Sequence, residues 1–209
     1  KAEKTTSFDL GYEKFFYNIN LGFNITYFDI EIEDPIVGWT SAQENGNGKN
    51  TSRGVELATN WTNKKNLNIG FNYTLIDSYA GLDCDKPNKD QYGYKSCIDS
   101  NNGIIDTAMV RVPLHAISSK IDYNHNKNFN SSLIFKYRGQ TRDYGGSDQD
   151  FYDQKLDEYL LVDFLSSYNL MNNYKLNFSL KNVLDKDYEN SYKYTGPPRT
   201  MNISFKKKF

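Results

Sequence analysis

Tyrosine and arginine side chains recur in the polar stretches of this chain, where they could bind a ligand without any covalent chemistry. Aromatic rings and guanidinium groups suit large planar or anionic molecules, because they offer stacking surfaces and several hydrogen-bond donors. The alternative is that most of these side chains pack within loops or lie in an interfacial aromatic belt. The candidate ligand-binding residues are Tyr92, Tyr94, Arg142, Tyr144, Tyr152, Tyr192, Tyr194 and Arg199.

The sequence offers little for catalysis or for metal binding. No Ser/His/Asp or paired-carboxylate arrangement stands out, so we predict that the protein is not an enzyme and needs no cofactor. His115 and His125 are isolated, and neither is a good axial ligand for haem iron. The acidic loop residues fit no defined calcium-binding spacing and are predicted to be solvated; they are Asp83, Asp85, Asp90, Asp99, Asp106, Asp143, Asp148, Asp150 and Asp153.

Two cysteines, Cys84 and Cys97, lie in the same polar loop. A disulfide formed in an oxidising compartment is the prediction, and two free thiols are the alternative. A zinc site is disfavoured, because neither histidine lies nearby in the sequence.

Charge and composition narrow the class of protein. The 209 residues carry 25 basic and 26 acidic side chains, which argues against a nucleic-acid binder. The chain has 17 Tyr and 13 Phe, yet its mean hydropathy is −0.74. No stretch approaches the roughly 18–20 apolar residues of a membrane helix. A barrel strand, however, needs only about 9–11 residues, and only alternate ones are apolar.

Alternation with a period of two dominates the chain. Leu67, Ile69 and Phe71, for example, alternate with Asn68 and Gly70. Because successive strand residues point to opposite sides, each such segment has one apolar and one polar face. No segment of comparable length shows helical periodicity. The predicted strands are 6–15, 18–34, 52–62, 66–78, 114–124, 128–139, 157–170, 174–183 and 199–209.

Short and long connections take turns along the chain. The short ones are 16–17, 63–65, 125–127 and 171–173, and the long ones span about 35–51, 79–113, 140–156 and 184–198. This pattern is typical of a transmembrane barrel, with tight periplasmic turns and long extracellular loops. A soluble β-sandwich is the alternative, but it rarely keeps four long loops at one end.

The second segment departs from simple alternation. After Tyr27 the apolar parity changes, so that Asp29 and Glu31 continue the side that Tyr27 occupied. Either a bulge re-aims the strand, or the strand has left the lipid and projects above it. We predict the second, since carboxylates that face hydrocarbon are costly.

The polar faces are too hydrophilic for a dry core. Seven charged side chains share the inward parity, namely Lys120, Asp122, Lys136, Arg138, Asp163, Lys175 and Lys181. Burying that many charges requires partners or water. A wide, wet lumen, or a lumen filled by a polar plug, is therefore predicted.

The end of the chain carries a further signal. Met201, Ile203, Phe205 and Phe209 share one parity, and Phe209 is the last residue. An amphipathic strand that ends in Phe resembles the signal read by the barrel-assembly machinery, with Phe205 and Phe209 as its main residues. The alternative, an ordinary edge strand, would leave a long exposed edge that invites aggregation.

Five motifs follow one another along the chain. They are Glu3 to Gly11, Ser52-Arg53-Gly54-Val55-Glu56, Arg111-x-Pro113-x-His115, the run Leu180 to Glu189 with Asn182, Asp185, Lys186 and Tyr188, and Tyr192-x-Tyr194 followed by Pro198-Arg199. Together they resemble the barrel of TonB-dependent outer-membrane receptors. The chain departs from that pattern at Pro198, where the family has Gly, and at Ala2 and Asp9, where it has Pro and Glu.

The resemblance implies a fold and a place in the cell. The fold would be all-β, an antiparallel transmembrane β-barrel of about 22 strands with an N-terminal plug. Residues 1–209 would be its C-terminal part of about nine strands, without the plug or the earlier strands. The chain would lie in the bacterial outer membrane, in contact with its lipid.

The resemblance also implies a function. Such receptors import a scarce small-molecule ligand when TonB pulls on the plug, and no covalent chemistry occurs. The ligand would be cobalamin or a ferric siderophore, and the Asp185–Glu189 run with the Tyr-x-Tyr loop is most similar to cobalamin receptors. The alternative is a passive porin or adhesion barrel, which would have the alternation but no reason to carry the motifs.

Overall fold

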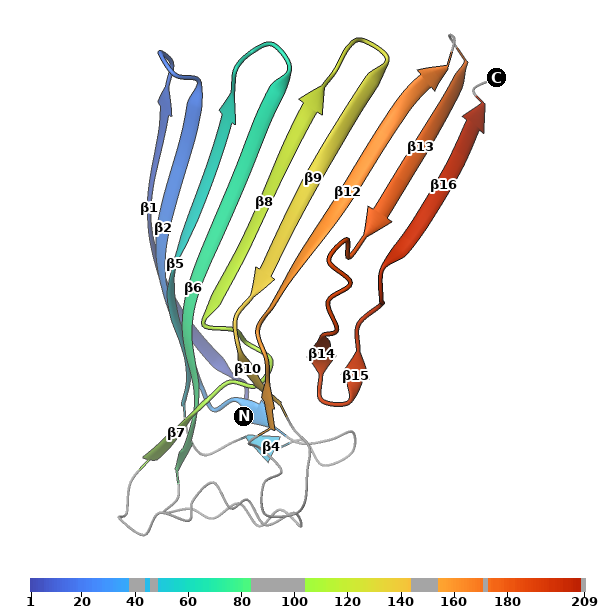
Figure 1. The fold of residues 1–209 in the computed structure, drawn as a ribbon. Coiled ribbons are helices and arrows are strands. Elements are labelled where there is room, and N and C mark those ends of the chain that lie inside the picture. The colour runs from blue at the N-terminus through green and yellow to red at the C-terminus, as the bar shows by residue number, and fades with distance from the viewer. Residues whose placement is uncertain (38–43, 46–48, 84–103, 144–153, 171–172, 208–209) are drawn as a thin grey trace.

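The computed structural model describes residues 1–37, 44–45, 49–83, 104–143, 154–170 and 173–207. Nine long strands dominate it: β1 (Lys4–Phe16), β2 (Leu21–Glu33), β5 (Lys49–Thr62), β6 (Leu67–Asp83), β8 (His115–Asn124), β9 (Phe129–Arg138), β12 (Tyr159–Leu170), β13 (Tyr174–Lys181) and β16 (Thr200–Lys207). They pair in chain order, each antiparallel to the next, and form one sheet (Figure 1). All nine predicted strands are confirmed.

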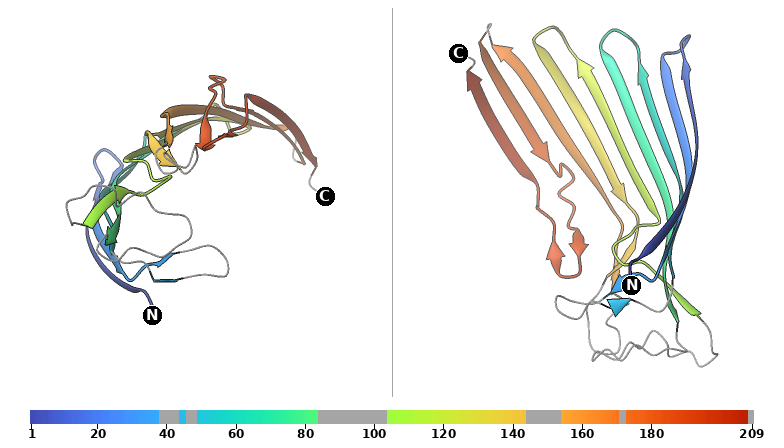
Figure 2. Two further views of the ribbon diagram at one scale, coloured as in Figure 1. Left: turned by 90° about the horizontal axis from the view of Figure 1, so that it is seen from below. Right: turned by 180° about the vertical axis from the view of Figure 1, so that it is seen from behind.

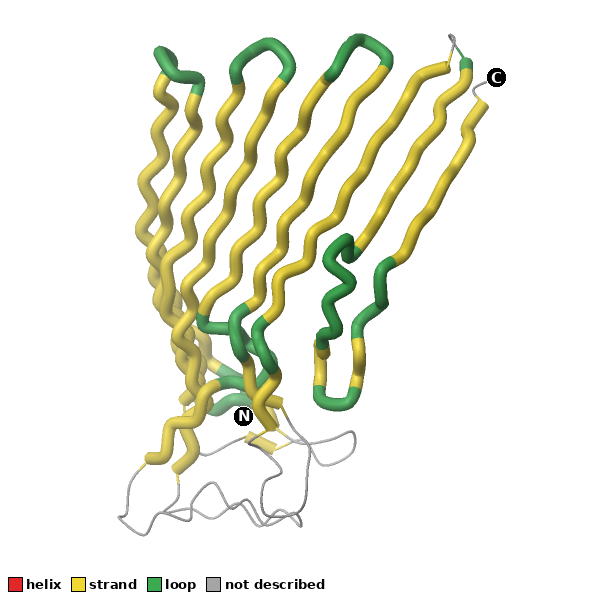
Figure 3. The backbone as a smooth tube through the Cα atoms, viewed as in Figure 1, coloured by secondary structure: helices red, strands yellow, loops and turns green. Residues whose placement is uncertain are grey.

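The sheet is curved and open. Seen from below, it forms an arc with β1 and β16 at its two free edges (Figure 2). The short turns lie at one end together with the C-terminus, and the longer connections lie at the other end (Figures 1 and 3). Antiparallel pairing of amphipathic strands along an arc is the geometry of part of a barrel wall. Within the described residues, no helix has the length and apolar character needed to cross a bilayer.

The longer connections hold short strands that the alternation did not predict. β3 (Ile36–Val37) pairs with β4 (Glu44–Asn45), β10 (Thr141–Asp143) with β11 (Gln154–Leu156), and β14 (Glu189–Ser191) with β15 (Tyr194–Thr195). β7 (Ile104–Ala108) continues the sheet against the far end of β6. Apart from β7, these strands have only two or three residues, too few for a pattern of period two to be recognised.

Asparagine shapes the short turns. Asn63 Oδ1 accepts hydrogen bonds from the backbone N–H groups of Lys65, Asn66 and Leu67, at 2.9–3.0 Å. Asn126 Oδ1 does the same for Asn128 and Phe129 in the next turn. Such side chains mimic the backbone of a turn, which explains why Asn clusters where the chain reverses.

The first turn differs from its prediction. Phe16 pairs with Leu21, so the reversal covers residues 17–20 and not only 16–17. Asn20 adopts a positive φ of 52°, which Asn tolerates better than most residues. Ile19, which fits the alternation of the second segment, therefore lies in the turn and is exposed.

One face of the sheet is apolar along its whole width. Near the short turns it carries aromatic rings that contact across strands: Phe129 with Tyr168 at 6.1 Å between ring centroids, and Tyr174 stacked on Phe205 at 5.4 Å. We call this the outer face. A belt of rings close to the strand ends is typical of the membrane interface. Phe205 of the predicted assembly signal lies in this belt, and Phe209 lies outside the described residues.

The opposite face, which we call the lumenal face, is polar. The strand register places all seven predicted inward charges on it, because Ser118 pairs with Lys136, Asp122 with Ser132, and Lys175 with Lys206. Some of the charges neutralise one another: Lys120 Nζ lies 2.8 Å from Asp122, and Lys136 Nζ lies 3.2 Å from Asp163. The prediction of a charged inner wall is confirmed.

No bulge explains the change of parity in β2. The register of β2 with β1 and with β5 runs without a shift from Leu21 to Glu33. Beyond Tyr27 the outer face carries ion pairs, with Lys49 Nζ 2.7 Å from Glu31 Oε1 and Arg53 Nε 3.1 Å from Asp29 Oδ2. Since about 9–11 residues cross the hydrocarbon, these pairs lie where a 13-residue strand projects beyond it.

Gly54 allows an aromatic ring to pack against the backbone on the lumenal face. Phe28 pairs with Gly54 across the strands, and a Cβ at Gly54 would lie 2.5 Å from Cζ of Phe28 and closer still to the carbonyl oxygen of Leu75. Gly54 is itself buried. The glycine of the Arg53-Gly54-Val55-Glu56 motif therefore serves the packing of a neighbouring aromatic side chain.

We predict that Gly54→Ala lowers the free energy of unfolding of the full-length protein by roughly 1–3 kcal/mol, because the ring and the backbone would have to move apart. The measurement is the urea midpoint in detergent micelles. Gly11→Ala is the control, since its Cβ would meet Thr26 Oγ1 only at 3.4 Å. Equal midpoints for the two variants would contradict the packing role of Gly54.

Candidate functional site

The candidate site lies at the end of the sheet with the longer connections. Of the predicted ligand-binding residues, Tyr92, Tyr94, Tyr144 and Tyr152 lie outside the described residues, and so do Cys84 and Cys97 of the predicted disulfide. Four remain. Tyr192 and Tyr194 lie in the β14–β15 hairpin, Arg142 lies in β10, and Arg199 immediately precedes β16.

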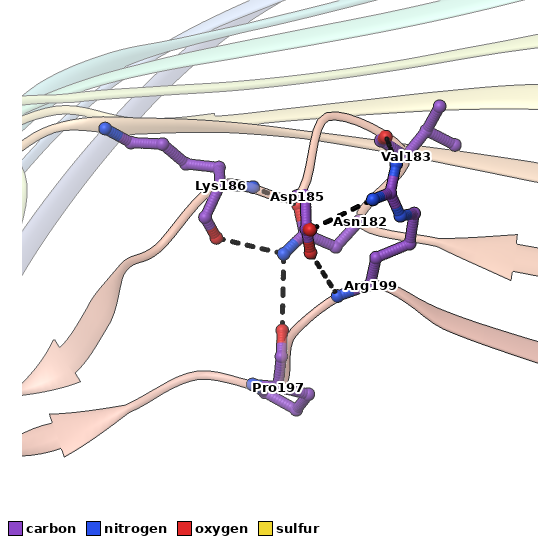
Figure 4. A network of polar contacts seen from close by, with 6 residues as sticks. All are labelled: Asn182, Val183, Asp185, Lys186, Pro197 and Arg199. Atoms are coloured by element: carbon purple, nitrogen blue, oxygen red, sulfur yellow. Dashed lines mark hydrogen bonds and ion pairs between the residues drawn. The ribbon is translucent and has the colours of Figure 1, made fainter.

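Arg199 closes the base of this hairpin. Its backbone N–H donates to Asp185 Oδ1 at 2.9 Å, and its guanidinium lies 3.0 Å from Asp185 Oδ2 (Figure 4). The guanidinium also donates to the carbonyl oxygen of Val183 at 3.4 Å. Arg199 thus fastens the start of β16 to the turn that follows β13. In this arrangement its hydrogen-bonding capacity serves the loop itself.

Asn182 is the centre of the same network. Its side chain is only 4% exposed, and its Nδ2 donates to the carbonyl oxygens of Lys186 and Pro197 at 2.9 and 3.3 Å (Figure 4). Its Oδ1 accepts from the backbone N–H of Lys186 at 2.9 Å. An amide is the one side chain that can both donate twice and accept at this place. Its φ of 49° is also one that Asn adopts readily.

Tyr188 forms the packed floor of the hairpin. Its ring lies 4.6 Å from that of Tyr159 and packs on Gly196, where a Cβ would lie only 2.0 Å from Cζ of Tyr188. Tyr159 in turn donates its hydroxyl to Asn190 Oδ1 at 2.9 Å. Burial raises the pKa of the Tyr188 hydroxyl, and the neighbouring Tyr159 and Asp163 add to the rise. Tyr188 is therefore neutral at physiological pH.

Asp143 joins the hairpin to two other connections. Its side chain is 0% exposed; Oδ1 lies 2.7 Å from Arg111 Nε, and Oδ2 accepts from the backbone N–H of Tyr192 at 2.7 Å. We call Arg111, Asp143 and the backbone of Tyr192 the loop latch. The prediction that Asp143 is solvated is wrong, because Arg111 and a backbone N–H together replace the water that a carboxylate needs.

Arg138 adds two further contacts to the latch. Its guanidinium donates to the carbonyl oxygens of Asn190 and Arg111 at 3.2 and 2.9 Å. The backbone N–H of Arg111 donates to the carbonyl oxygen of Arg142 at 2.7 Å. Arg111 has a φ of 63°, an uncommon conformation that the surrounding bonds maintain. Arg111, the first residue of the Arg-x-Pro-x-His motif, therefore stabilises the loops through its contact with Asp143.

The tip of the hairpin is presented outward. Tyr194 is 73% exposed, and Lys193 Nζ lies 5.1 Å from the ring centroid of Tyr192. Arg142 is exposed on the neighbouring β10–β11 ribbon. The structure thus brings Tyr192 and Tyr194 together on one hairpin, which hydrogen bonds join to Asp143 and Arg138. It places Arg199 at the hairpin base, apart from the tip.

Both histidines face away from this site. His115 Nδ1 lies 2.8 Å from the Tyr73 hydroxyl on the outer face. His125 lies in a short turn at the opposite end, with its ring stacked 4.3 Å from that of Phe129. Within the described residues, no group of three His, Cys, Asp or Glu side chains could hold a metal ion.

An apolar outer face, a polar inner face and turns of alternating length define the wall of an outer-membrane β-barrel. The model of the TonB-dependent receptor-like β-barrel family matches residues 1–183. The chain therefore belongs to the TonB-dependent receptor family and is an outer-membrane protein. No curated protein sequence matches it.

Solved structures share the fold at low sequence identity. The FrpB iron transporter from Neisseria meningitidis (F5-1 variant, apoprotein form) is 17% identical, with a TM-score of 0.75, all of this chain covered and 32% of that one. The ferric-catecholate import receptor Fiu from E. coli K12 is 18% identical, with a TM-score of 0.73. The match covers 100% of this chain and 28% of that one. The pyoverdine receptor FpvA from Pseudomonas aeruginosa PAO1 is 15% identical, with a TM-score of 0.70. The match covers 99% of this chain and 30% of that one. The chain thus spans about a third of their length.

We predict that Asn182→Asp destabilises the barrel by at least about 2 kcal/mol, since a carboxylate oxygen would face two carbonyl oxygens in a buried place. The urea midpoint of the full-length protein measures it. Asn173→Asp, in an exposed turn, is the matched control and should stay within about 0.5 kcal/mol. The role assigned to Asn182 is wrong if both variants keep the original midpoint.

A second prediction concerns the loop latch. Asp143→Asn retains the size but replaces one carboxylate oxygen by an NH₂ group, which cannot accept the Tyr192 N–H. This N–H should therefore exchange with deuterium about 10-fold faster. Hydrogen-exchange mass spectrometry of peptides from 189–195 gives the readout, in the absence of any ligand. Asp157→Asn, an exposed carboxylate that follows β11, is the control. Unchanged exchange in Asp143→Asn would show that the latch does not hold the hairpin.

Proposed function

We propose that this protein is a receptor that binds a scarce iron chelate at its extracellular loops and admits it across the outer membrane. The observation that carries the proposal is the hairpin of residues 189–195, which the loop latch and Tyr188 hold rigid while its aromatic tip stays exposed. Rigid aromatic side chains give contact area at a low cost in conformational entropy. Family membership supports a receptor over a passive barrel, whose loops would have no need of such a support.

The choice of ligand class rests on the related structures. The Fiu structure is described as a ferric-catecholate import receptor, and the FrpB structure as an iron transporter. Ferric chelates of this kind are bulky and carry aromatic or anionic groups, which suit Tyr192, Lys193 and Tyr194. Cobalamin is the second candidate, favoured by the Asp185–Glu189 run. In the structure, however, Asp185, Lys186 and Tyr188 of that run fasten the loop.

The proposed mechanism involves binding and passage without covalent chemistry. The exposed tip captures the ligand, and the protein needs no cofactor and catalyses no reaction. Release into the periplasm would depend on TonB acting on an N-terminal plug, as the family resemblance implies. The wall described here would supply the extracellular loops and one side of the passage.

Titration of the full-length protein with a ferric catecholate, a ferric hydroxamate and cyanocobalamin tests the proposal, with intrinsic fluorescence as the readout. We expect saturable binding of one iron chelate and a Kd raised about 10-fold by Tyr194→Ala. Tyr17→Ala is the control, because Tyr17 is 81% exposed at the opposite end of the sheet.

Each other result has a definite meaning. Saturable binding of cyanocobalamin alone would replace the iron chelate by cobalamin. Equal effects of Tyr194→Ala and Tyr17→Ala would remove the hairpin tip from the binding site. An absence of saturable binding together with free diffusion of small solutes through reconstituted vesicles would establish the passive barrel.

A further inference from the structure

Exposed lysines gather at the end of the sheet that carries the short turns. The turns 17–20, 63–66, 125–128 and 171–173 contain no Asp or Glu. Three exposed lysines lie in two of these turns, and two more lie on the outer face next to the turns, where Lys14 pairs with Phe23 and Lys207 with Tyr174. We call the five residues the basic rim, which consists of Lys14, Lys64, Lys65, Lys127 and Lys207.

Two lysines of the basic rim lie over aromatic rings of the outer face. Lys14 Nζ is 5.4 Å from the ring centroid of Phe16, and Lys207 Nζ is 5.6 Å from that of Tyr174. A lysine at such a place keeps its aliphatic stem along the apolar surface and its ammonium group in a polar layer. Aromatic rings near the strand ends mark the membrane interface. The two ammonium groups therefore lie at the level of the lipid headgroups.

The carboxylates at this end of the sheet lie on the other face. Glu13 and Asp122 occupy lumenal positions, where they pair with Asn24 and Ser132. Lys14 and the three turn lysines make no ion pair with any residue that the structure describes. The positive charge of these four side chains is therefore not neutralised by the described part of the wall.

The opposite end of the outer face differs, because its cations on β1 and β5 have carboxylate partners. Lys4 Nζ lies 3.2 Å from Glu33, and Lys49 Nζ lies 2.7 Å from Glu31. Arg53 has a partner on β2 in the same way. The outer face thus neutralises its own charge where it projects beyond the hydrocarbon on the extracellular side. On the periplasmic side, an anion that balances the basic rim must come from the surroundings.

We propose that the basic rim binds the headgroups of anionic phospholipids in the periplasmic leaflet, with their phosphates beside the lysine ammonium groups. The rim runs from β1 to β16, the two edges of the sheet, and so follows the whole arc (Figure 2). A protein partner would cover one patch of such an arc, whereas lipid surrounds every strand. Basic side chains near a membrane surface attract anionic lipids. The inference rests on the outer-membrane location of the chain, and not on the identity of the transported ligand.

Electron paramagnetic resonance of spin-labelled lipids tests the proposal on the full-length protein in phosphatidylcholine vesicles. The probes are phosphatidylglycerol and phosphatidylcholine labelled on the acyl chain, and the immobilised fraction of each gives its relative association with the protein. We expect the unmodified protein to prefer phosphatidylglycerol by about 3-fold. The triple variant Lys64→Gln, Lys65→Gln and Lys127→Gln should lose about half of this preference, because three of the five rim charges are removed.

A matched triple variant removes three exposed lysines away from the rim, namely Lys155→Gln, Lys181→Gln and Lys186→Gln. It changes the net charge equally and should keep the full preference for phosphatidylglycerol. The proposal is overturned if the unmodified protein shows no preference, which would leave the rim to water or to an acidic periplasmic protein. It is also overturned if the rim variant keeps the full preference, or if both triple variants lose it equally. Ligand titration should be unchanged in the rim variant, so failure of lipid binding and failure of the proposed function can be told apart.

Discussion

Backbone hydrogen bonding within a membrane is the constraint on which the rest of this structure depends. In hydrocarbon each unpaired N–H or C=O group costs several kcal/mol, so the strands must pair along their whole length. The register of β1, β2, β5 and β6 accordingly runs without a shift for 13 residues at each of the first three junctions. Because the register is continuous, side-chain parity is continuous too. A single face thus meets lipid across all nine strands, and the change at Tyr27 marks where the hydrocarbon ends.

The loops at the other end are not under this constraint, because water can satisfy their backbone groups. Side-chain hydrogen bonds and packing must therefore fix their conformation. Asn182 and Asp143 contribute to this through the hydrogen bonds of their buried side chains, and Tyr188 contributes through its ring contact with Tyr159. A buried carboxylate without Arg111 would be strongly unfavourable, so the presence of the pair specifies one arrangement of three connections. The family motifs thus primarily stabilise the conformation of the loops. We propose that the ligand is recognised by the exposed residues of the loops that these motifs stabilise.

The distribution of charge on the lumenal face follows from the same continuous register, because every second residue of each strand points to this face. Where acids and lysines alternate on β8, β9 and β12, the wall is balanced by short ion pairs. Where the alternate residues are only Lys, Asn, Ser and Thr, the imbalance remains as a surface property. The charge of the lumenal face therefore differs from strand to strand.

The sequence by itself determined the nine strands, their order, the two faces and the alternation of connections, because period-two patterning fixes which side of a strand is apolar. It also determined the family, through Asn182 to Tyr188 and Arg111 to His115. Only the tertiary structure decided that the first turn covers 17–20, that Asp143 is buried, and that Arg199 binds Asp185. The last two depend on contacts between residues 14 to 49 positions apart, for which alternation carries no information. Local patterning sets each strand, whereas the burial of a polar side chain is set by whatever the fold brings against it.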